Sequence, residues 1–376
     1  MIWKDRNIIL FSLLLAMLIG WPVTYTGFFQ RGANWISDHI QYNWGDYADF
    51  DDIVIIDIDE TSMRALESQL GVWPYERDVY AVTIEYLQQA GAKKIVFDIL
   101  FSEKRQGDEA FSEALQIDDN VYLASILLHE FRFLDERVTQ ALDKHGWQVV
   151  NPPELPNKGI LLPHTQLLAH ADTGVISVFP DEDGVVRKLP LLLNIDDHYL
   201  PGMMLSLLSD GNKPQLEFDW NTDRAIHDGT SWPVTPLGEV TLKYPVNLQD
   251  MPVIPFYKFL LYVYSGGNQT HDAFRDKTVF IGSTASILGD YAYIPGAGRV
   301  HGLGILALSY HSLKQANLLK TGVMAADGMM LFIFILLIGG LIWFRGIRPL
   351  PLMVAYLLSI AIAYVAAVLF YRYVDI

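Results

Sequence analysis

Three apolar runs constrain this chain more than any other feature of its sequence. They cover residues 8–29, 323–344 and 350–370, and Asp327 is the only charged residue in them. Each run is long enough to cross a hydrocarbon core about 30 Å thick as an α-helix. The runs therefore predict three transmembrane helices and a protein held in a lipid bilayer. Asp327 lies near the outer end of its run, where it would face water.

Basic residues beside these runs predict their orientation. Two of them lie in the head, residues 1–7, and Arg345 and Arg348 lie in the turn at residues 345–349. Because such residues collect on the cytoplasmic side of a membrane, both segments are expected in the cytoplasm. Residues 30–322 are then expected outside it, as the periplasmic or extracellular domain of a bacterial inner-membrane protein.

The two ends of the chain follow from the same topology. No small-x-small cleavage site follows the first run, so it is interpreted as an uncleaved anchor rather than a signal peptide. Three spans that start inside finish outside, which places residues 371–376 on the extracytoplasmic side. The chain is therefore expected to be truncated before a further span, without a cytoplasmic output module.

Composition narrows the class of partner. The net charge is −16, which argues against nucleic acid because phosphate binding requires basic patches. The chain has no cysteine, and this excludes disulfides, a thiol nucleophile and thiolate metal sites.

The segment between the apolar runs alternates buried-strand and helix patterns. Strands are predicted at residues 53–59, 93–101, 121–127 and 277–283. Helices are predicted at residues 78–89, 109–116, 201–209 and 300–319, the last of them amphipathic and leading into the second apolar run. This order indicates an α/β fold, with a mixed or mostly parallel extracytoplasmic sheet flanked by helices, plus the transmembrane helices.

Two segments interrupt the alternation. Residues 130–163 are polar and contain prolines, and we expect a loop there. Residues 175–193 are predicted to form a β-hairpin that turns at Asp183 and Gly184.

Carboxylates end two neighbouring predicted strands. Asp57 and Asp59 stand two apart, so they project to one face, and Asp98 and Glu103 follow the next strand. Ligands of open α/β sheets bind at the carboxyl ends of the strands. A divalent cation or a basic ligand would suit this group, with Asp57, Asp59 and Asp98 as the metal candidates. The alternative is that these carboxylates cap helices or pair with nearby basic residues.

Other ligand-binding candidates lie close in the sequence to these strand ends. Arg77 precedes a predicted helix in a segment that we interpret mainly as structural. The alternative is that Arg77 reaches the acidic strand ends or binds a ligand carboxylate. Ser283 and Thr284 follow a buried strand, where backbone amides would face an anion, and Asp290 joins the group if the chain folds back. The glycines and lysine of a phosphate-binding loop are missing there.

No arrangement of catalytic residues is identifiable from spacing. His301 and His311 are ten residues apart, which does not stack them on one helix face as metal ligands would require. We therefore predict that this chain is not an enzyme. A metal-dependent hydrolase built on the three aspartates is the weaker alternative.

Six segments of the chain read, in this order, IVIIDIDETS, GVWPYERDVYA, AGAKKIVFDILFSE, VISVFPDEDGVVRKLPLLL, FRDKTVFIGSTASILGDYAYIP and RVHGLGILALSYHSLK. Together they resemble the CHASE2 extracellular sensor domain of bacterial transmembrane receptors. The resemblance implies an N-terminal span, the sensor domain, and typically three C-terminal spans before a nucleotide cyclase, diguanylate cyclase or kinase. Only two C-terminal runs are present here, which suggests either a truncation before the last span or an atypical member of the family.

The function predicted on this basis is signal transduction. An unknown extracytoplasmic ligand or protein would shift the last helix of the domain and, through it, the spans. A homodimer is expected, and Gly339 and Gly340 would allow its helices to approach closely. The alternative is an envelope scaffold or interaction protein without a ligand-dependent switch.

Overall fold

The computed structural model describes residues 27–128, 136–209, 215–265, 272–286, 291–296 and 298–320. The chain divides into two compact units, one formed by Met1–Asp46 with Lys320–Ile376 and the other by Tyr47–Leu319. Helix α2 (Gly27–Trp44) is the described element of the first unit and begins within the first apolar run. Most of that run, the other two runs, the turn and residues 371–376 lie outside the described residues. Within the described ranges, no helix combines the length and apolar character needed to cross a membrane.

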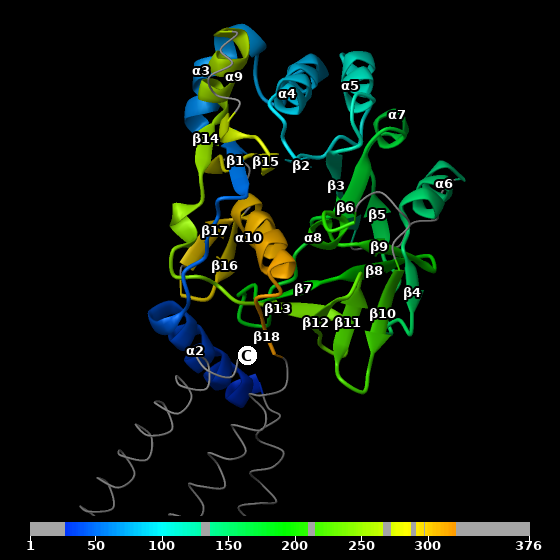
Figure 1. The fold of residues 1–376 in the computed structure, drawn as a ribbon, viewed down its shortest axis with the longest axis vertical. Coiled ribbons are helices and arrows are strands. Elements are labelled where there is room, and N and C mark those ends of the chain that lie inside the picture. Colours follow the sequence, from blue (N-terminus) through cyan, green and yellow to red (C-terminus); the bar gives the residue numbers. More distant parts are fainter. Residues whose placement is uncertain are drawn as a thin grey trace, which may run out of the picture. The chain divides into compact units, whose positions relative to one another are not determined.

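The second unit is built around one large sheet (Figure 1). Its strands run in the order β14 (Val253–Pro255), β1 (Ile53–Asp57), β15 (Thr278–Gly282), β2 (Lys94–Asp98) and β3 (Val121–Leu128). Beyond β3, β6 (Asp172–Val175) continues the parallel arrangement, and β5 (Gly159–Leu161) pairs antiparallel with β3. The mixed, mostly parallel sheet expected from the sequence is thus confirmed.

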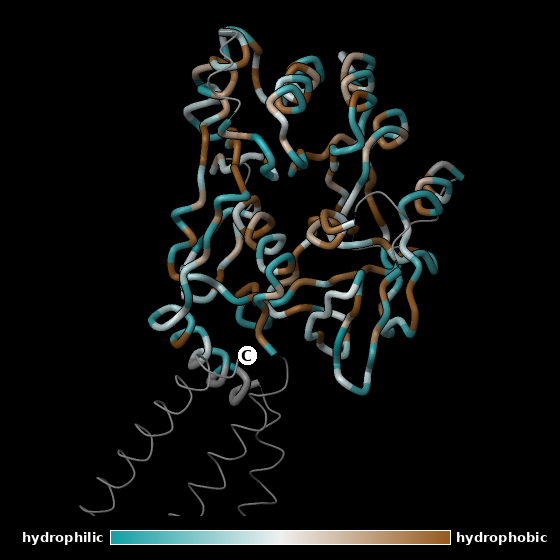
Figure 2. Tube along the Cα trace, viewed as in Figure 1, coloured by the Kyte–Doolittle hydropathy of each residue, from teal (hydrophilic) through white to brown (hydrophobic). Residues whose placement is uncertain are grey.

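Alternating side chains of these strands enter two separate cores. In β1, Val54 and Ile56 pack into one core, and Ile53 and Ile55 pack into the other. The first core is covered by α3 (Glu60–Leu70), α4 (Arg77–Gln89), α5 (Asp108–Leu115), α7 (Thr165–Leu168) and α9 (Phe256–Ser265). The second is covered by α8 (Met203–Ser206) and α10 (Gly302–Lys314). Because both faces are buried, the strands are apolar without alternation in the sequence, as Figure 2 shows.

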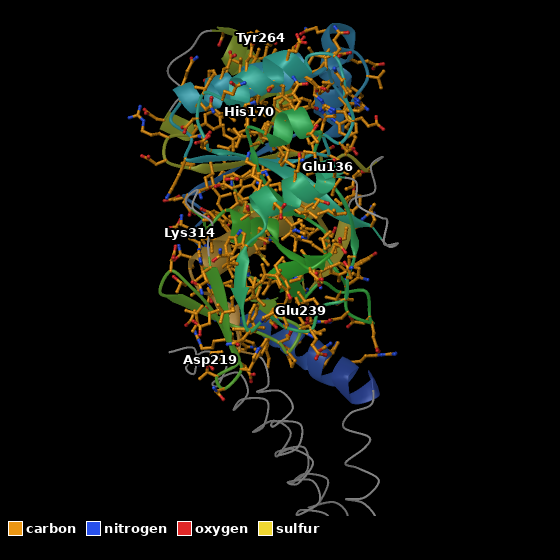
Figure 3. The ribbon with its side chains drawn as sticks, turned by 90° about the vertical axis from the view of Figure 1, so that its right-hand side faces the viewer. Glu136, His170, Asp219, Glu239, Tyr264 and Lys314 are labelled. Atoms are coloured by element: carbon orange, nitrogen blue, oxygen red, sulfur yellow. The ribbon has the colours of Figure 1, made fainter. Side chains whose placement is uncertain are left out.

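A second β region lies beyond α8 and α10 and closes the second core. Its sheets are β12 (Thr230–Pro233) with β11 (Arg224–His227), β10 (Gln215–Asp219) and β4 (Gln148–Val150), and β18 (Leu318–Leu319) with β13 (Glu239–Leu242) and β7 (Lys188–Pro190). Two further pairs are β8 (Leu192–Ile195) with β9 (His198–Pro201) and β16 (Tyr291–Ile294) with β17 (Gly298–His301). Helix α6 (Glu136–His145) and the short helix η1 (Leu248–Asp250) complete the described elements. Charged side chains such as Glu136 lie at the surface (Figure 3).

Three predictions about local structure are wrong. Residues 175–193 do not form a hairpin, because β6 pairs with β3 and β7 pairs with β13; only the tight turn at Gly184, with φ 82°, is present. Residues 130–163 contain α6, β4 and β5 rather than one loop. The predicted helix at 201–209 is the single turn α8.

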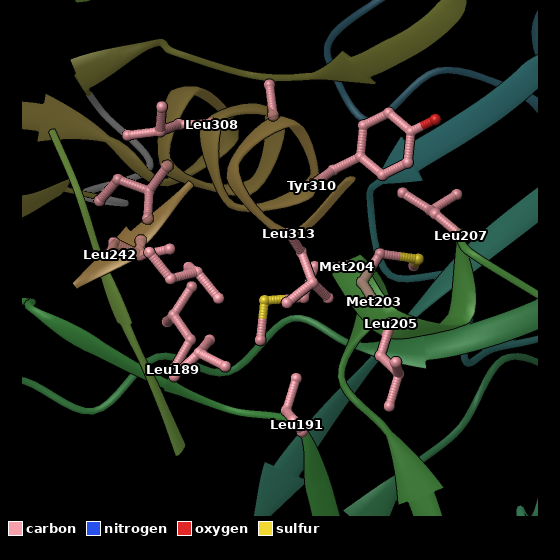
Figure 4. Packing of buried hydrophobic residues seen from close by; sticks show 14 of the residues in the cluster. Leu189, Leu191, Met203, Met204, Leu205, Leu207, Leu242, Leu308, Tyr310 and Leu313 are labelled. Carbon is pink, nitrogen blue, oxygen red and sulfur yellow. The ribbon is translucent and has the colours of Figure 1, made fainter. Parts of the chain in front are cut away.

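The last helix also differs from its prediction. It ends at Lys314, Ala316 takes φ 52°, and β18 then pairs with β13, so the helix does not continue to residue 319. It is buried nearly all round rather than amphipathic, because it lies between the large sheet and the second β region (Figure 4).

Candidate functional site

The carboxyl ends of three central strands lie in one row. Asp57 of β1 pairs in register with Gly282 of β15, which pairs in register with Asp98 of β2. The alternation along the strands directs both aspartates toward the face that α10 covers. The sequence analysis therefore placed the two carboxylates correctly at one edge of the sheet. The prediction that their strands are neighbours is wrong, because β15 lies between β1 and β2.

The Asp57 side chain is hydrogen-bonded to the turn that follows β15. Its two carboxylate oxygens accept hydrogen bonds from the Thr284 backbone N–H at 3.0 Å and from Thr284 Oγ1 at 2.6 Å. Burial raises the pKa of Asp57, and the bonds from Thr284 offset only part of that rise. Ser283 Oγ donates to the carbonyl of Ile58 at 2.7 Å. Asp57, Ser283 and Thr284 thus fasten the end of β15 to β1.

The neighbouring Asp59 and Glu60 accept hydrogen bonds from backbone N–H groups. Asp59 is the N-cap of α3 and accepts a hydrogen bond from the Ser62 N–H at 2.6 Å. Glu60 accepts from the Ser286 N–H at 2.6 Å, and the hydrogen bonds from Ser286 lower the pKa of Glu60 to about 2.

The metal-binding expectation for Asp57, Asp59 and Asp98 is not supported. Among the described residues, no three acidic, histidine or cysteine side chains are grouped so as to hold a metal ion. Gly282 separates the two strand-end aspartates, and the Leu303 side chain packs over it: a Cβ atom added to Gly282 would lie 3.0 Å from Leu303 Cδ1. An apolar side chain therefore packs over the residue that lies between the two aspartates in the sheet. Asp290 lies outside the described residues.

Arg77 pairs elsewhere than expected. Its Nε donates to Asp108 Oδ1 at 3.2 Å, its Nη2 donates to the Glu103 carbonyl at 3.3 Å, and its guanidinium lies 4.4 Å from the centre of the Phe101 ring. Both side chains of the ion pair are buried, at 3% and 2% exposure. Burial lowers the pKa of Arg77, and Asp108 counters that effect. The Glu103 side chain is 79% exposed and contributes only its carbonyl to this contact.

A cavity of about 440 Å³ opens at this edge of the sheet. The predicted site residues Arg77, Asp98 and Ser283 line it, whereas Asp57, Asp59, Glu103 and Thr284 do not. Its volume is in the range of small-molecule sites. Its other described lining residues are Trp73, Pro74, Ile99, Leu100, Arg105, Ile126, Val175, Ile176, Ser177, Val178, Leu189, Pro190, Gly202, Met203, Met204, Gly302, Ile305, Leu306 and Ser309.

Sequence reasoning missed most of this wall. Arg105 lies in the loop after β2, and Met203 and Leu306 come from α8 and α10. Nothing in the local sequence marks these residues, because an apolar cavity wall and a packed core have the same pattern. The one available signal was position: segments after parallel strands gather at the edge where Asp98 and Ser283 had already been placed.

The sequence as a whole matches a known family. The family model of the CHASE2 domain matches residues 11–342. This chain belongs to the CHASE2 domain family. CHASE2 is an extracellular sensory domain, typically of signal-transduction receptors, and the resemblance seen in the six sequence segments is confirmed. Searches of curated proteins and of solved structures gave no significant match.

Proposed function

We propose that this chain is the sensing part of a bacterial transmembrane receptor, and that the CHASE2 domain detects a small ligand in the cavity described above. The domain would lie outside the inner membrane, and the signal would pass through residues 323–344 and 350–370 to a cytoplasmic output module. Family membership supports the sensory role, and basic residues beside the apolar runs support the orientation.

One observation carries the proposal: α10 forms a wall of the cavity and is the last helix of the domain. Its first two turns line the cavity, through Gly302, Ile305, Leu306 and Ser309. A ligand that binds one position of α10 better than another would shift the population of the two positions.

The C-terminal end of α10 is hydrogen-bonded to β12 and to the residue before β1. Trp232 Nε1 donates to the Leu313 carbonyl at 2.8 Å, and Lys314 donates to Asp52 at the start of β1. Strand β18 follows and pairs with β13. A shift of α10 would therefore act on a short strand, rather than directly on a continuous helix as the sequence analysis expected.

We propose no catalytic step in this domain. Asp57 and Asp59, two of the three carboxylates that a hydrolase would need, accept the hydrogen bonds described above, and Gly282 lies between Asp57 and Asp98 in the sheet. The scaffold alternative differs from the sensor in one measurable respect, because a scaffold needs no small ligand. The homodimer stays a prediction, to be checked by light scattering of the purified full chain.

Ligand detection is tested on the full chain in nanodiscs. Thermal unfolding is followed against a panel of amino acids, sugars, nucleotides and carboxylates, with a Leu306→Trp variant that fills the cavity. Leu237→Trp is the matched control, since Leu237 is 53% exposed and does not line the cavity. A stabilising compound whose effect is lost only in Leu306→Trp supports the sensor. If no compound class stabilises the native chain, the cavity has no sensing role and the scaffold is favoured.

Orientation is tested separately, and the absence of cysteine makes the labelling free of background. Val72→Cys places a thiol on a side chain that is 78% exposed, and Gly346→Cys places one in the predicted cytoplasmic turn. In intact cells, a membrane-impermeant maleimide should label the first variant and not the second. The reverse pattern would overturn the proposed topology.

A further inference from the structure

The charged and the apolar residues of the cavity wall come from two different parts of the chain. The charged residues among the described lining residues are Arg77, Asp98 and Arg105, which come from the start of α4 and the end of β2 with its following loop. The wall formed from residues 126–309 is apolar apart from serine hydroxyls and backbone groups. A ligand that matches both sides must be amphipathic.

We propose that the cavity binds a small monocarboxylate with an apolar body, with its carboxylate at Arg77 and its body against α8 and α10. This inference rests on the proposed sensory role of the same cavity. It adds the chemical class of the ligand.

The Arg77 guanidinium is held in one orientation by its neighbours. Asp108 and the Glu103 carbonyl fix its Nε and Nη2, and Phe101 supports one face of the guanidinium. Its Nη1 makes no hydrogen bond with any described residue, although the side chain is only 3% exposed and lines the cavity. A buried guanidinium with a spare donor favours a carboxylate, because charge-assisted hydrogen bonds are strongest away from water. Its orientation is already fixed, so little side-chain entropy is lost on binding.

The other charges on the wall limit the ligand to one negative charge. Arg105 adds a second cation, 39% exposed and only loosely paired with Glu103 at 3.9 Å. Asp98 faces the same space and would repel a second anionic charge. The wall therefore favours a monocarboxylate over a phosphate monoester or a dicarboxylate.

The apolar side of the cavity suits a flexible or branched body. Met203 and Met204 of α8 line it together with Ile305 and Leu306 of α10. Methionine side chains adapt to irregular shapes, so this wall selects for apolar character more than for one outline. The contact with α10 places the ligand body against the helix that would carry the signal.

The test uses probes that differ only in their head group. Hexanoate, hexanol, hexylamine and hexyl phosphate are titrated by calorimetry into the full chain in nanodiscs, and empty nanodiscs correct for partition into lipid. We expect hexanoate to bind about ten- to a hundredfold more tightly than hexanol, because it gains a charged hydrogen bond. Equal or tighter binding of the alcohol, the amine or the phosphate overturns the assignment, and so does failure of hexanoate to bind.

Variants locate the head group. Arg77→Lys keeps the charge but loses the planar fork, and should bind hexanoate about tenfold more weakly. Because this change also strains the pair with Asp108, Arg105→Gln is measured beside it, with an expected two- to fivefold loss of about the size of an exposed ion pair. Arg275→Gln, at a side chain 63% exposed and away from the cavity, is the control and should bind hexanoate normally. Equal affinity in all three variants overturns the inference.

Failure of this inference is distinguishable from failure of the proposed function. If hexanoate does not bind but another compound stabilises the chain and loses its effect in Leu306→Trp, the cavity is a sensor site for a different ligand class. If nothing in the wider panel binds, both proposals fall.

Discussion

Gly174 controls how closely α8 approaches the sheet, and its replacement by alanine is the sharpest test of the packing beneath the cavity. A Cβ atom at this position would lie 2.9 Å from the Met203 backbone nitrogen, 3.1 Å from Ser206 Cβ and closer still to Met203 Cα. Carbon atoms pack most favourably at about 3.5–4.0 Å, so the added methyl group overlaps backbone that cannot rotate away.

The magnitude follows from what holds α8 in place. Ser206 Oγ donates to the Thr173 carbonyl at 2.9 Å, and Lys94 Nζ donates to the Leu207 carbonyl just after the helix. The helix must move by about 1 Å against these bonds. We therefore expect a cost near the upper end for overpacking, about 3 kcal/mol. For a domain of this size, that lowers the melting temperature by about 6–12 °C.

The assay is thermal unfolding of the full chain in nanodiscs, with Gly304→Ala as the matched control. Gly304 lies in α10, and an added Cβ would meet only Val300 Cγ1 at an ordinary 3.5 Å. Alanine should stabilise the helix there by about 0.5–1 kcal/mol. A melting temperature for Gly174→Ala within about 2 °C of the native value would refute the proposed packing of α8 on β6.

Three further predictions concern buried polar groups and the start and end of the domain. The folded-state pKa of Asp57 is raised, so the contribution of Asp57 to the free energy of unfolding falls as pH rises above about 4. In urea titrations, the free energy of unfolding of Asp57→Asn should therefore increase over that range relative to that of the unsubstituted protein. The contacts of Asp52 with His311 and Lys314 lower its folded-state pKa, so these contacts stabilise the protein above about pH 4 and are lost on acidification. Asp52→Asn should cost about 1–2 kcal/mol at pH 7 and progressively less toward pH 2. Trp232→Phe leaves the Leu313 carbonyl without its indole donor and should cost about 1–3 kcal/mol by urea unfolding, and an unchanged midpoint would contradict that role.

The central sheet was predictable because its signal is local. Strands β1, β2, β3 and β15 are short apolar runs, and helices α4 and α5 follow or precede them with clear helical patterns. The strands that were missed contain two to five residues, and most of them belong to the second β region. Some of them pair with distant segments, as β18 does with β13, and such pairing leaves almost no trace in a short sequence window.

The candidate site was only half predictable, for a related reason. The strand-end rule correctly gathered Arg77, Asp98 and Ser283 around one space. It did not show that Leu303 would pack over Gly282, or that Asp108 would pair with Arg77, because both contacts depend on where α5 and α10 pack. An acidic cluster at a strand edge and a set of separately hydrogen-bonded carboxylates are the same in sequence.

The burial of α10 explains both the failed prediction and the proposed mechanism. A surface helix pushed by a ligand would relax through side chains that face water, and the displacement would end there. Leu303, Ile305, Leu308, Tyr310 and Leu313 of α10 instead belong to one core shared with α8 and the second β region, where close packing leaves little room for such relaxation. Pressure on the first turns of α10 must then move the helix as a unit or not at all. Because the same helix ends at contacts with Trp232 and Asp52 just before β18, such a movement would reach the end of the domain without a separate relay.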